Sequence, residues 1–463
     1  MLNRQKDYLR LRETYQKLIY KDFQYCIKND MLSIDFEFVM ISNPDSGIAD
    51  IFFKPEIVLP FPISKNAENH KSEELNNFVF HMGMVELISY WKSACPSEVI
   101  VLPYRLNENQ LQFWKKLYWN GLGEFFYTNG IETSEKDFMM LYSVSEKELR
   151  FAQLQSQERI LVPIGGGKDS AVSLEILKNT TLELFPFIIN PRLASRATVK
   201  QAEISNDFLL EAKRAIDPKL IELNQQGFLN GHTPFSAMLA FTALLQAYLF
   251  DIKYIALSNE SSANEVSVAN SHVNHQYSKS FEFENDFRNY AKTYITADIH
   301  YFSFLRPLSE LQIACLFSKL ESHHFSFRSC NVGSKTDSWC GNCPKCLFTY
   351  IILSPFLAQE KLSKMLGSNL LSNLSLNNSL KELRGQAETK PFECVGTIDE
   401  VNLALHQALL KQNYQSALVQ TTDFSASTEF LFDQALKEWN PDHFLPEFLE
   451  KLLKQKLSSC SES

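Results

Sequence analysis

A chain of 463 residues is too long for one ordinary hydrophobic core, and its length predicts about two to three domains. Its hydrophobic content of 45%, which includes 36 phenylalanines, can fill such cores and excludes a globally disordered protein. A formal net charge of −9 argues against extensive nucleic-acid binding, which requires a positive surface.

The first part of the chain, residues 1–150, mixes short strand-like runs with helical stretches. Its N-terminus carries charges every few residues and so lacks the apolar segment of a secretory signal. Apolar and polar residues alternate from Ile34 to Phe38, which predicts a half-buried strand. We therefore expect an N-terminal α+β domain that could bind substrate. Within it, "GLGEFFYTNGI" predicts a turn packed on a core, with a role in holding substrate as the alternative.

Residues 151–355 show a different pattern, in which strand-like runs alternate with helices. "RILVPI", "LELFPFIIN" and "DIKYIALSNE" are the predicted strands, and strand–helix–strand order with short links predicts a doubly wound parallel sheet of the α/β class. The most apolar stretch, Phe235 to Phe250, is shorter than the roughly 20 residues of a membrane span, so we expect a buried helix. Residues 356–463 predict a mostly helical region that caps this domain.

A glycine loop follows the first strand of this second domain. It reads Gly165, Gly166, Gly167, Lys168, Asp169 and Ser170. Consecutive glycines allow backbone amides to approach an anion, and the following helix N-terminus favours negative charge, so the loop predicts a phosphate site. A Walker-type loop is excluded because Asp169 occupies the position of the required hydroxyl residue, and the spacing does not fit a dinucleotide fingerprint. A plain strand-to-helix turn is the remaining structural alternative.

Polar residues gather where the strand "KYIAL" ends, which is where an open α/β sheet places its ligands. Ser258, Asn259 and Glu260 follow that strand directly and are predicted to bind the nucleotide, while Glu265 could ligate Mg²⁺. His232, His275 and Lys279 are predicted to transfer protons near neutral pH. Any one of these residues alone is more often a solvated loop residue. Lys168 and Asp169 of the glycine loop are predicted to be catalytic as well.

Four of the nine cysteines crowd into one segment: Cys330, Cys340, Cys343 and Cys346. Two overlapping C-x2-C steps and a fourth cysteine predict a tetrahedral structural zinc site. Thiols buried as small hydrophobic groups are the alternative. The odd total and this clustering fit a reducing compartment better than a disulfide framework, so we expect a cytoplasmic protein.

The glycine loop resembles the S-G-G-x-D-S loop of the PP-loop ATP pyrophosphatases, which cleave ATP between the α and β phosphates. The resemblance implies that Lys168 neutralises phosphate charge, Asp169 helps to hold Mg²⁺ and Ser170 donates a hydrogen bond. Gly165 replaces the usual leading serine, which removes one hydroxyl donor to pyrophosphate.

A wider set of segments, including "NGHTPFS", "SNESSANE", "VNHQYSKS", "YFSFLRPLSE" and "WCGNCPKCLF", resembles the MurL family of glutamate epimerases as far as about Thr397. The resemblance implies ATP- and Mg²⁺-dependent inversion of the terminal L-Glu of UDP-N-acetylmuramoyl-L-Ala-L-Glu, with release of AMP and diphosphate, for peptidoglycan synthesis. A glycine at the first loop position is normal in that family.

Three other functions stay open at this point. A PP-loop amide- or nitrile-forming enzyme, such as a 7-cyano-7-deazaguanine synthase, would pass its adenylate to ammonia, and such enzymes carry a very similar four-cysteine pattern. A tRNA-modifying PP-loop enzyme would need a basic groove, which the net charge does not favour. A nucleotide-binding regulator would have no need for the polar loops. We expect a small-molecule substrate and no nucleic-acid or membrane partner, while the sequence leaves the oligomeric state open.

Overall fold

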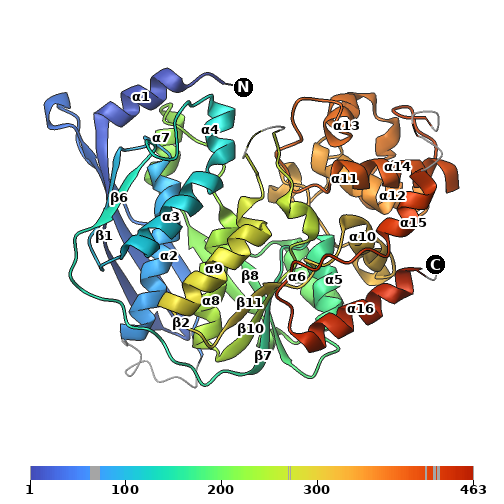
Figure 1. Cartoon of the computed structure of the whole chain (residues 1–463), viewed down its shortest axis with the longest axis horizontal. Coiled ribbons are helices and arrows are strands. Elements are labelled where there is room, and N and C mark those ends of the chain that lie inside the picture. The colour runs from blue at the N-terminus through green and yellow to red at the C-terminus, as the bar shows by residue number, and fades with distance from the viewer. Residues whose placement is uncertain are drawn as a thin grey trace. The chain divides into compact units, whose positions relative to one another are not determined.

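The computed structural model describes residues 2–62, 73–268, 271, 273–411, 414–420, 424 and 428–461 (Figure 1). The chain forms two compact units that alternate along the sequence. The first unit comprises residues 1–159, 210–255 and 272–301, and the second comprises residues 160–209, 256–271 and 302–463. A three-part division at residues 150 and 355 stays a prediction, since the units are built from interleaved segments.

The first unit contains a sheet with strand order β9-β4-β2-β1-β5-β6, and β3 also pairs with β2. The strands are β1 (Tyr15–Lys28), β2 (Met31–Ser42), β3 (Ile51–Phe53), β4 (Glu56–Pro60), β5 (Glu98–Val101), β6 (Met140–Ser143) and β9 (Leu210–Ala215). β1 and β2 form an antiparallel hairpin, whose turn residues Asn29 and Asp30 both have positive φ. Ile34, Phe36 and Phe38 are fully buried, which confirms the predicted one-sided strand. β9 pairs antiparallel with β4, although its sequence lies in the segment predicted as a parallel sheet.

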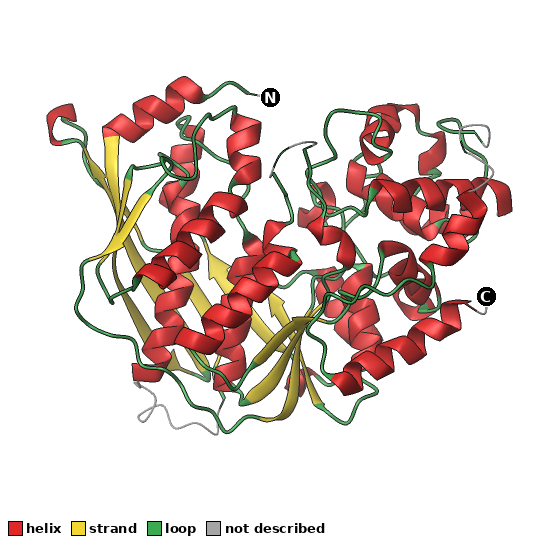
Figure 2. Cartoon of the chain, in the orientation of Figure 1, coloured by secondary structure: helices red, strands yellow, loops and turns green. Residues whose placement is uncertain are grey.

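The first unit also contains several helices (Figures 1 and 2). They are α1 (Gln5–Thr14), α2 (Glu73–Trp91), α3 (Glu108–Gly121), α4 (Gly123–Asn129), α7 (Pro218–Gln225), α8 (Phe235–Leu249) and α9 (Phe281–Tyr294). α2 contacts β1, β2 and α8. α8 is the predicted apolar helix and its side chains are mostly buried, as expected. None of the described helices is long and apolar enough to cross a bilayer.

The segment "GLGEFFYTNGI" differs from the prediction. Only its ends are turns, because α3 ends at Gly121 and Gly130 caps the next helix with a φ of 61°. The residues between them form α4, whose Phe125 and Phe126 are buried. The aromatic residues thus anchor a short helix rather than a loop.

The second unit contains β8 (Glu183–Ile189) and the carboxyl-terminal parts of β7 (Gln157–Pro163), β10 (Ile252–Leu257) and β11 (His300–Ser303), in the order β11-β10-β7-β8. α5 (Lys168–Leu177) and α6 (Leu193–Gln201) alternate with β7 and β8 along the chain. β7, α5 and β8 follow one another as predicted, and the α/β class is confirmed.

The rest of the second unit is helical, as predicted for residues beyond 356. It contains α10 (Glu310–Ser318), α11 (Pro344–Leu353), α12 (Gln359–Leu366), α13 (Asn377–Leu383), α14 (Ile398–Lys411), α15 (Thr428–Ala435) and α16 (Glu447–Ser461). The leucine-rich segment 370–383 forms two short 3-10 turns followed by α13.

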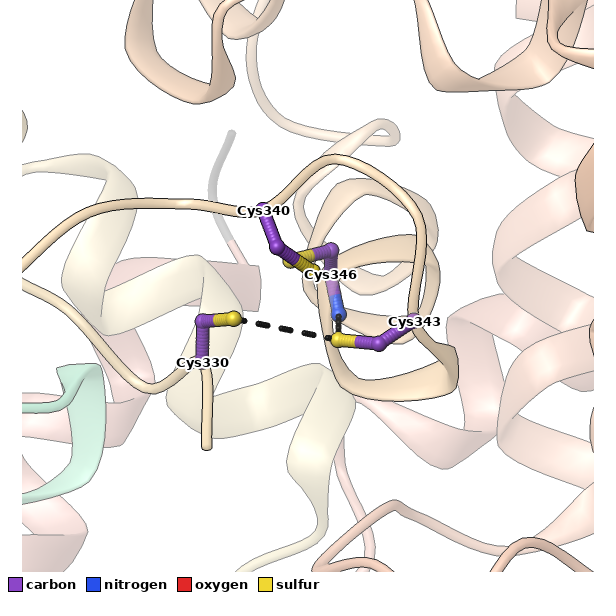
Figure 3. Close-up of side chains that lie close together, drawn as sticks. All are labelled: Cys330, Cys340, Cys343 and Cys346. Carbon is purple, nitrogen blue, oxygen red and sulfur yellow. Dashed lines mark hydrogen bonds between the residues drawn. The ribbon is translucent and has the colours of Figure 1, made fainter. Parts of the chain in front are cut away.

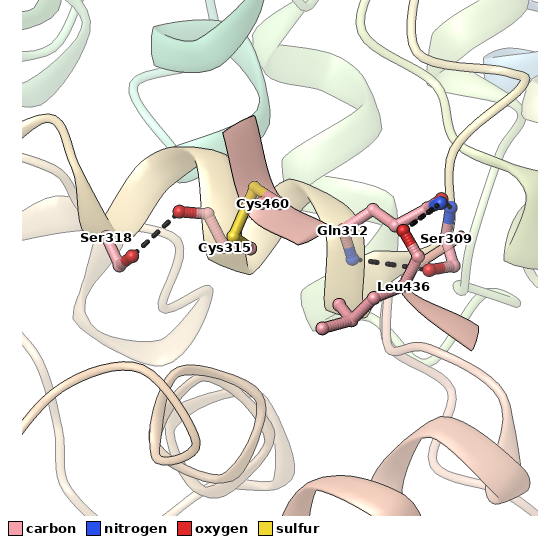
Figure 4. Close-up of a disulfide and its surroundings, with 6 residues drawn as sticks. All are labelled: Ser309, Gln312, Cys315, Ser318, Leu436 and Cys460. Atoms are coloured by element: carbon pink, nitrogen blue, oxygen red, sulfur yellow. Dashed lines mark hydrogen bonds between the residues drawn. A yellow bond between two sulfur atoms is a disulfide. The ribbon is translucent and has the colours of Figure 1, made fainter. Parts of the chain in front are cut away.

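One disulfide, which the sequence did not suggest, joins α10 to α16. It links Cys315 to Cys460 across 145 residues of chain (Figure 4). Near it, the side-chain amide of Gln312 donates hydrogen bonds to the carbonyls of Leu436 and Glu438 at 3.1 and 2.7 Å. The C-terminal helix is therefore attached to α10 both covalently and through its preceding loop.

Candidate active site

The glycine loop lies between β7 and α5 in the second unit. Gly165 opens it, and Gly166 has a φ of +88°, which side-chain-bearing residues rarely adopt. A Cβ on Gly166 would lie 2.7 Å from the backbone nitrogen of Ser195. No side chain caps the N-terminus of α5 at Gly167, and the Oγ of Ser170 accepts a hydrogen bond from the Gly166 N–H at 3.3 Å. The loop therefore keeps its backbone close to the start of α5.

Lys168 is buried and binds two carboxylates. Its ammonium donates to Asp169 and to Glu310, which begins α10. Burial alone would lower the pKa of Lys168, but the two carboxylates outweigh it and raise that pKa above its usual value. Burial also raises the pKa of Glu310 to about 8, against the opposing charge of Lys168. Oxygens of Asp169, Glu260 and Glu310 lie within 4.8 Å of one another, so these three carboxyl groups form one cluster.

The three residues after β10 lie in the second unit. The side-chain amide of Asn259 donates to the Ser303 hydroxyl at 3.0 Å, and the Ser262 hydroxyl donates to Glu260 at 3.1 Å. The Oγ of Ser258 is buried, and the described residues offer it no hydrogen-bond partner. A buried hydroxyl without a partner is costly in a folded protein, so this atom suits a ligand.

Glu265 lies apart from the carboxylate cluster within the described residues. It forms an ion pair with Lys390, whose ammonium also donates to the carbonyl of Gly396 at 2.9 Å. A lysine already neutralises this carboxylate, so Glu265 has less reason than Glu260 to bind a metal ion.

The predicted proton-transfer residues lie together in the first unit. The rings of His232 and His275 are 4.5 Å apart between centroids, and both contact Glu124 of α4. Burial lowers the pKa of His232 to about 4, with a further contribution from the charge of His275. The charge of Lys279 acts on His232 in the same direction. His272, in the same segment as His275, lies outside the described residues.

The four predicted cysteine ligands converge in the second unit (Figure 3). The Sγ atoms of Cys330 and Cys343 are 3.8 Å apart, and those of Cys340 and Cys346 are 3.7 Å apart. All four sulfurs lie within 4.8 Å of one another. Hydrogen bonds from Cys346 lower the pKa of the Cys343 thiol to about 5, so one thiolate is already favoured.

Comparison with known proteins identifies the family. The MurL N-terminal domain matches residues 10–304, and the MurL C-terminal domain matches residues 326–436. The chain belongs to the MurL family.

Three relatives of this MurL chain carry the name UDP-N-acetyl-alpha-D-muramoyl-L-alanyl-L-glutamate epimerase. The protein from Xanthomonas oryzae pv. oryzae is 35% identical over 327 residues, which is 69% of this chain and 71% of the relative. Those from Salinispora tropica and Micromonospora sp. are 33% and 32% identical, over 76% and 86% of this chain and 77% and 91% of the relatives.

The sequence did not predict the carboxylate that binds Lys168 or the carboxylate that contacts His232 and His275. Glu310 binds Lys168, and it lies in "YFSFLRPLSE", a segment quoted only for its resemblance to the MurL family. Glu124 binds His275, and it lies in the segment read as a packed turn. The sequence signal that could have identified them is the carboxylate inside each of these unusual segments.

Proposed function

We propose that this MurL-family enzyme epimerises the terminal L-Glu of UDP-N-acetylmuramoyl-L-Ala-L-Glu to D-Glu through an ATP-dependent acyl-adenylate, with release of AMP and diphosphate. The observation that carries the proposal is family membership over most of the chain, together with the shared epimerase name of the three relatives. Such an enzyme is an isomerase that acts on an amino-acid derivative. The reaction would serve peptidoglycan precursor synthesis in the cytoplasm.

The chemistry gives ATP a reason to take part. Removing a proton from the carbon beside a free carboxylate would put a second negative charge next to the first. Joining the carboxylate to AMP removes its charge, so that hydrogen-bond donors can stabilise the developing enolate. A base then removes the α-proton, a proton returns to the other face, and water releases AMP.

We assign ATP binding to the second unit, which would then be a PP-loop domain. The triphosphate would lie on the glycine loop, whose backbone passes close to α6 at Gly166 because that residue has no Cβ, and Ser170 and Lys168 are the nearby polar groups. The unpartnered Oγ of Ser258 is a further donor to the nucleotide.

Mg²⁺ would fit the carboxylate cluster in this unit. Asp169, Glu260 and Glu310 supply oxygen ligands, which Mg²⁺ prefers, and Lys168 offsets part of their negative charge. The ion would supply positive charge to the phosphates. Glu265 stays a predicted ligand without further support.

Zinc would fit the four cysteines. With Zn–S distances of about 2.3 Å, a tetrahedral shell separates its sulfurs by roughly 3.8 Å. The observed separations of 3.7 and 3.8 Å match that value. We assign the ion to folding, because four protein ligands leave no open position.

We assign proton transfer to the first unit, where His232 and His275 contact Glu124 and the charge of Lys279 acts on His232. At neutral pH a histidine with a lowered pKa is uncharged and able to accept a proton. Activation and proton transfer are thus assigned to one cluster in each unit.

The test is incubation of the purified protein with ATP, Mg²⁺ and UDP-N-acetylmuramoyl-L-Ala-L-Glu in D₂O. We expect AMP, deuterium at the Glu α-carbon and conversion to D-Glu. AMP without deuterium or D-Glu would remove the epimerase function but keep ATP cleavage, and Lys168→Ala is the variant expected to lose AMP formation.

A further inference from the structure

Glu124 holds two histidines from distant parts of the chain. One of its carboxylate oxygens, Oε2, lies 2.5 Å from Nδ1 of His275 and 3.5 Å from Nδ1 of His232. The carboxylate comes from α4, His232 precedes α8 and His275 precedes α9. One oxygen therefore faces the same ring nitrogen of both histidines.

Glycines let the loop that carries His232 approach α3 and α4 closely. A Cβ on Gly121 would lie 2.7 Å from the Pro234 ring, and one on Gly231 would lie 3.0 Å from the Phe125 ring. Both distances are too short for an ordinary contact. Side chains at these positions would push the loop that carries His232 away from α4. Part of the unusual glycine content of "GLGEFFYTNGI" is thereby explained.

Hydrogen bonds from other residues also hold the loop that carries His232. The Lys92 ammonium, from α2, donates to the carbonyl of Gly231 at 2.5 Å. The side-chain amide of Asn129, at the end of α4, donates to the carbonyl of Asn230 at 3.1 Å. Both donors are buried. The position of His232 is therefore held by buried hydrogen bonds rather than left to an exposed loop.

The direct contact between Glu124 and His275 determines which nitrogen carries the proton. An ionised carboxylate only accepts hydrogen bonds, so Nδ1 of His275 donates and Nε2 holds the lone pair. An ion shared by Glu124, His232 and His275 is the alternative arrangement of the same side chains.

We propose that Glu124 is a positioning residue for proton transfer, which fixes the tautomer of His275 and stabilises its imidazolium. This rests on the proposed epimerase function. Nε2 of His275 bonds to the α-proton, and the C–H electron pair stays on the activated substrate as an enolate. A proton from water or a protonated side chain then bonds to the opposite face, and His275 releases its proton to water.

The first test compares Glu124→Gln with the wild-type enzyme. The amide keeps the shape but removes the charge, so we expect AMP formation within about threefold of wild type. Deuterium exchange at the α-carbon should fall roughly 10²-fold, the usual size of a general-base contribution. The matched control is Glu108→Gln in α3, because Glu108 is exposed and contacts only Gln112 on its own helix among the interactions described for it. It should change neither rate.

The second readout is the pH profile of deuterium exchange. Glu124 of α4 and His232 face His275, and Lys92 of α2 and Lys279 act on His232 beside it. The carboxylate favours the protonated imidazole, and the other three oppose it when charged. Removing the carboxylate therefore lowers the pKa of the base, so the acid limb of the profile should move to lower pH by roughly one unit in Glu124→Gln. Glu124→Asp keeps the charge and should keep the limb near its wild-type position.

Several results would overturn the inference while leaving the epimerase function intact. One is a Glu124→Gln variant in which the rate of deuterium exchange and the acid limb of its pH profile are both unchanged. Another is an equal loss of AMP formation and exchange, because that would mean a general structural role. A third is one bound metal ion per chain that is lost in His275→Ala, since the cluster would then be a metal site. If wild-type protein gives no exchange at all, the proposed function fails instead.

Discussion

Replacing Gly166 by alanine should destabilise the second unit, and Gly165→Ala provides a matched comparison one residue away. The φ of +88° at Gly166 costs a non-glycine residue about 1–2 kcal/mol. The new Cβ would also lie 2.7 Å from the nitrogen of Ser195 and 2.9 Å from the carbonyl carbon of Ala194, and backbone atoms cannot rotate away. Together these effects predict a loss of roughly 2–4 kcal/mol. At Gly165 a Cβ would meet no atom within 4 Å, so we expect a change within about 0.5 kcal/mol.

Scanning calorimetry measures the difference between these two variants. For a unit of this size, each kcal/mol shifts the midpoint by roughly 2–4 °C, so Gly166→Ala should unfold about 5–10 °C below Gly165→Ala. Equal midpoints would refute the reasoning, because they would mean that α6 moves at no cost to admit the methyl group. AMP formation should fall further in Gly166→Ala than in Gly165→Ala for the same steric reason.

Three other substitutions test separate features. Cys340→Ser should remove about one zinc ion per chain by elemental analysis, and unchanged zinc would disprove the four-cysteine site. Glu86→Gln breaks a buried two-point ion pair with Arg214, at 2.7 and 2.8 Å, so it should lower the free energy of unfolding in denaturant by roughly 3–5 kcal/mol, while a loss below about 1 kcal/mol would contradict this. Cys315→Ser should abolish any effect of reductant on the thermal midpoint. The bond to Cys460 closes a 145-residue separation and contributes at most about 5 kcal/mol, so a reductant effect that persists in the variant would have another origin.

Local sequence patterns predicted the local parts of this structure. The apolar run before Gly165 and the glycines themselves predicted β7, the loop and α5, since all the interactions that define them lie within about 20 residues. The overlapping cysteine spacing likewise predicted that four sulfurs would meet, and they do. Burial of α8 followed from its composition.

The partners across the sites could not be predicted in the same way. Glu310 reaches Lys168 over 142 residues and Glu124 reaches His275 over 151 residues. No spacing along the sequence predicts either pair, because the fold of the intervening strands and helices brings the two residues together. The disulfide was missed for the same reason, and the cysteine count favoured thiols. β9 pairs with β4 because the two strands belong to the same unit. Hydrophobic periodicity predicts strands but does not tell which strands share a unit.

The interleaved units have a consequence for how the protein is made. The chain passes between them five times, after residues 159, 209, 255, 271 and 301. On the ribosome, the first unit lacks its complete last segment until residue 301 has emerged, and by then two segments of the second unit have already been synthesised. Those segments, residues 160–209 and 256–271, must wait for the C-terminal helices before their own core can close. A contiguous fragment cut from either half would therefore expose apolar surface meant for sequence it lacks, and only the full chain is expected to fold without aggregating.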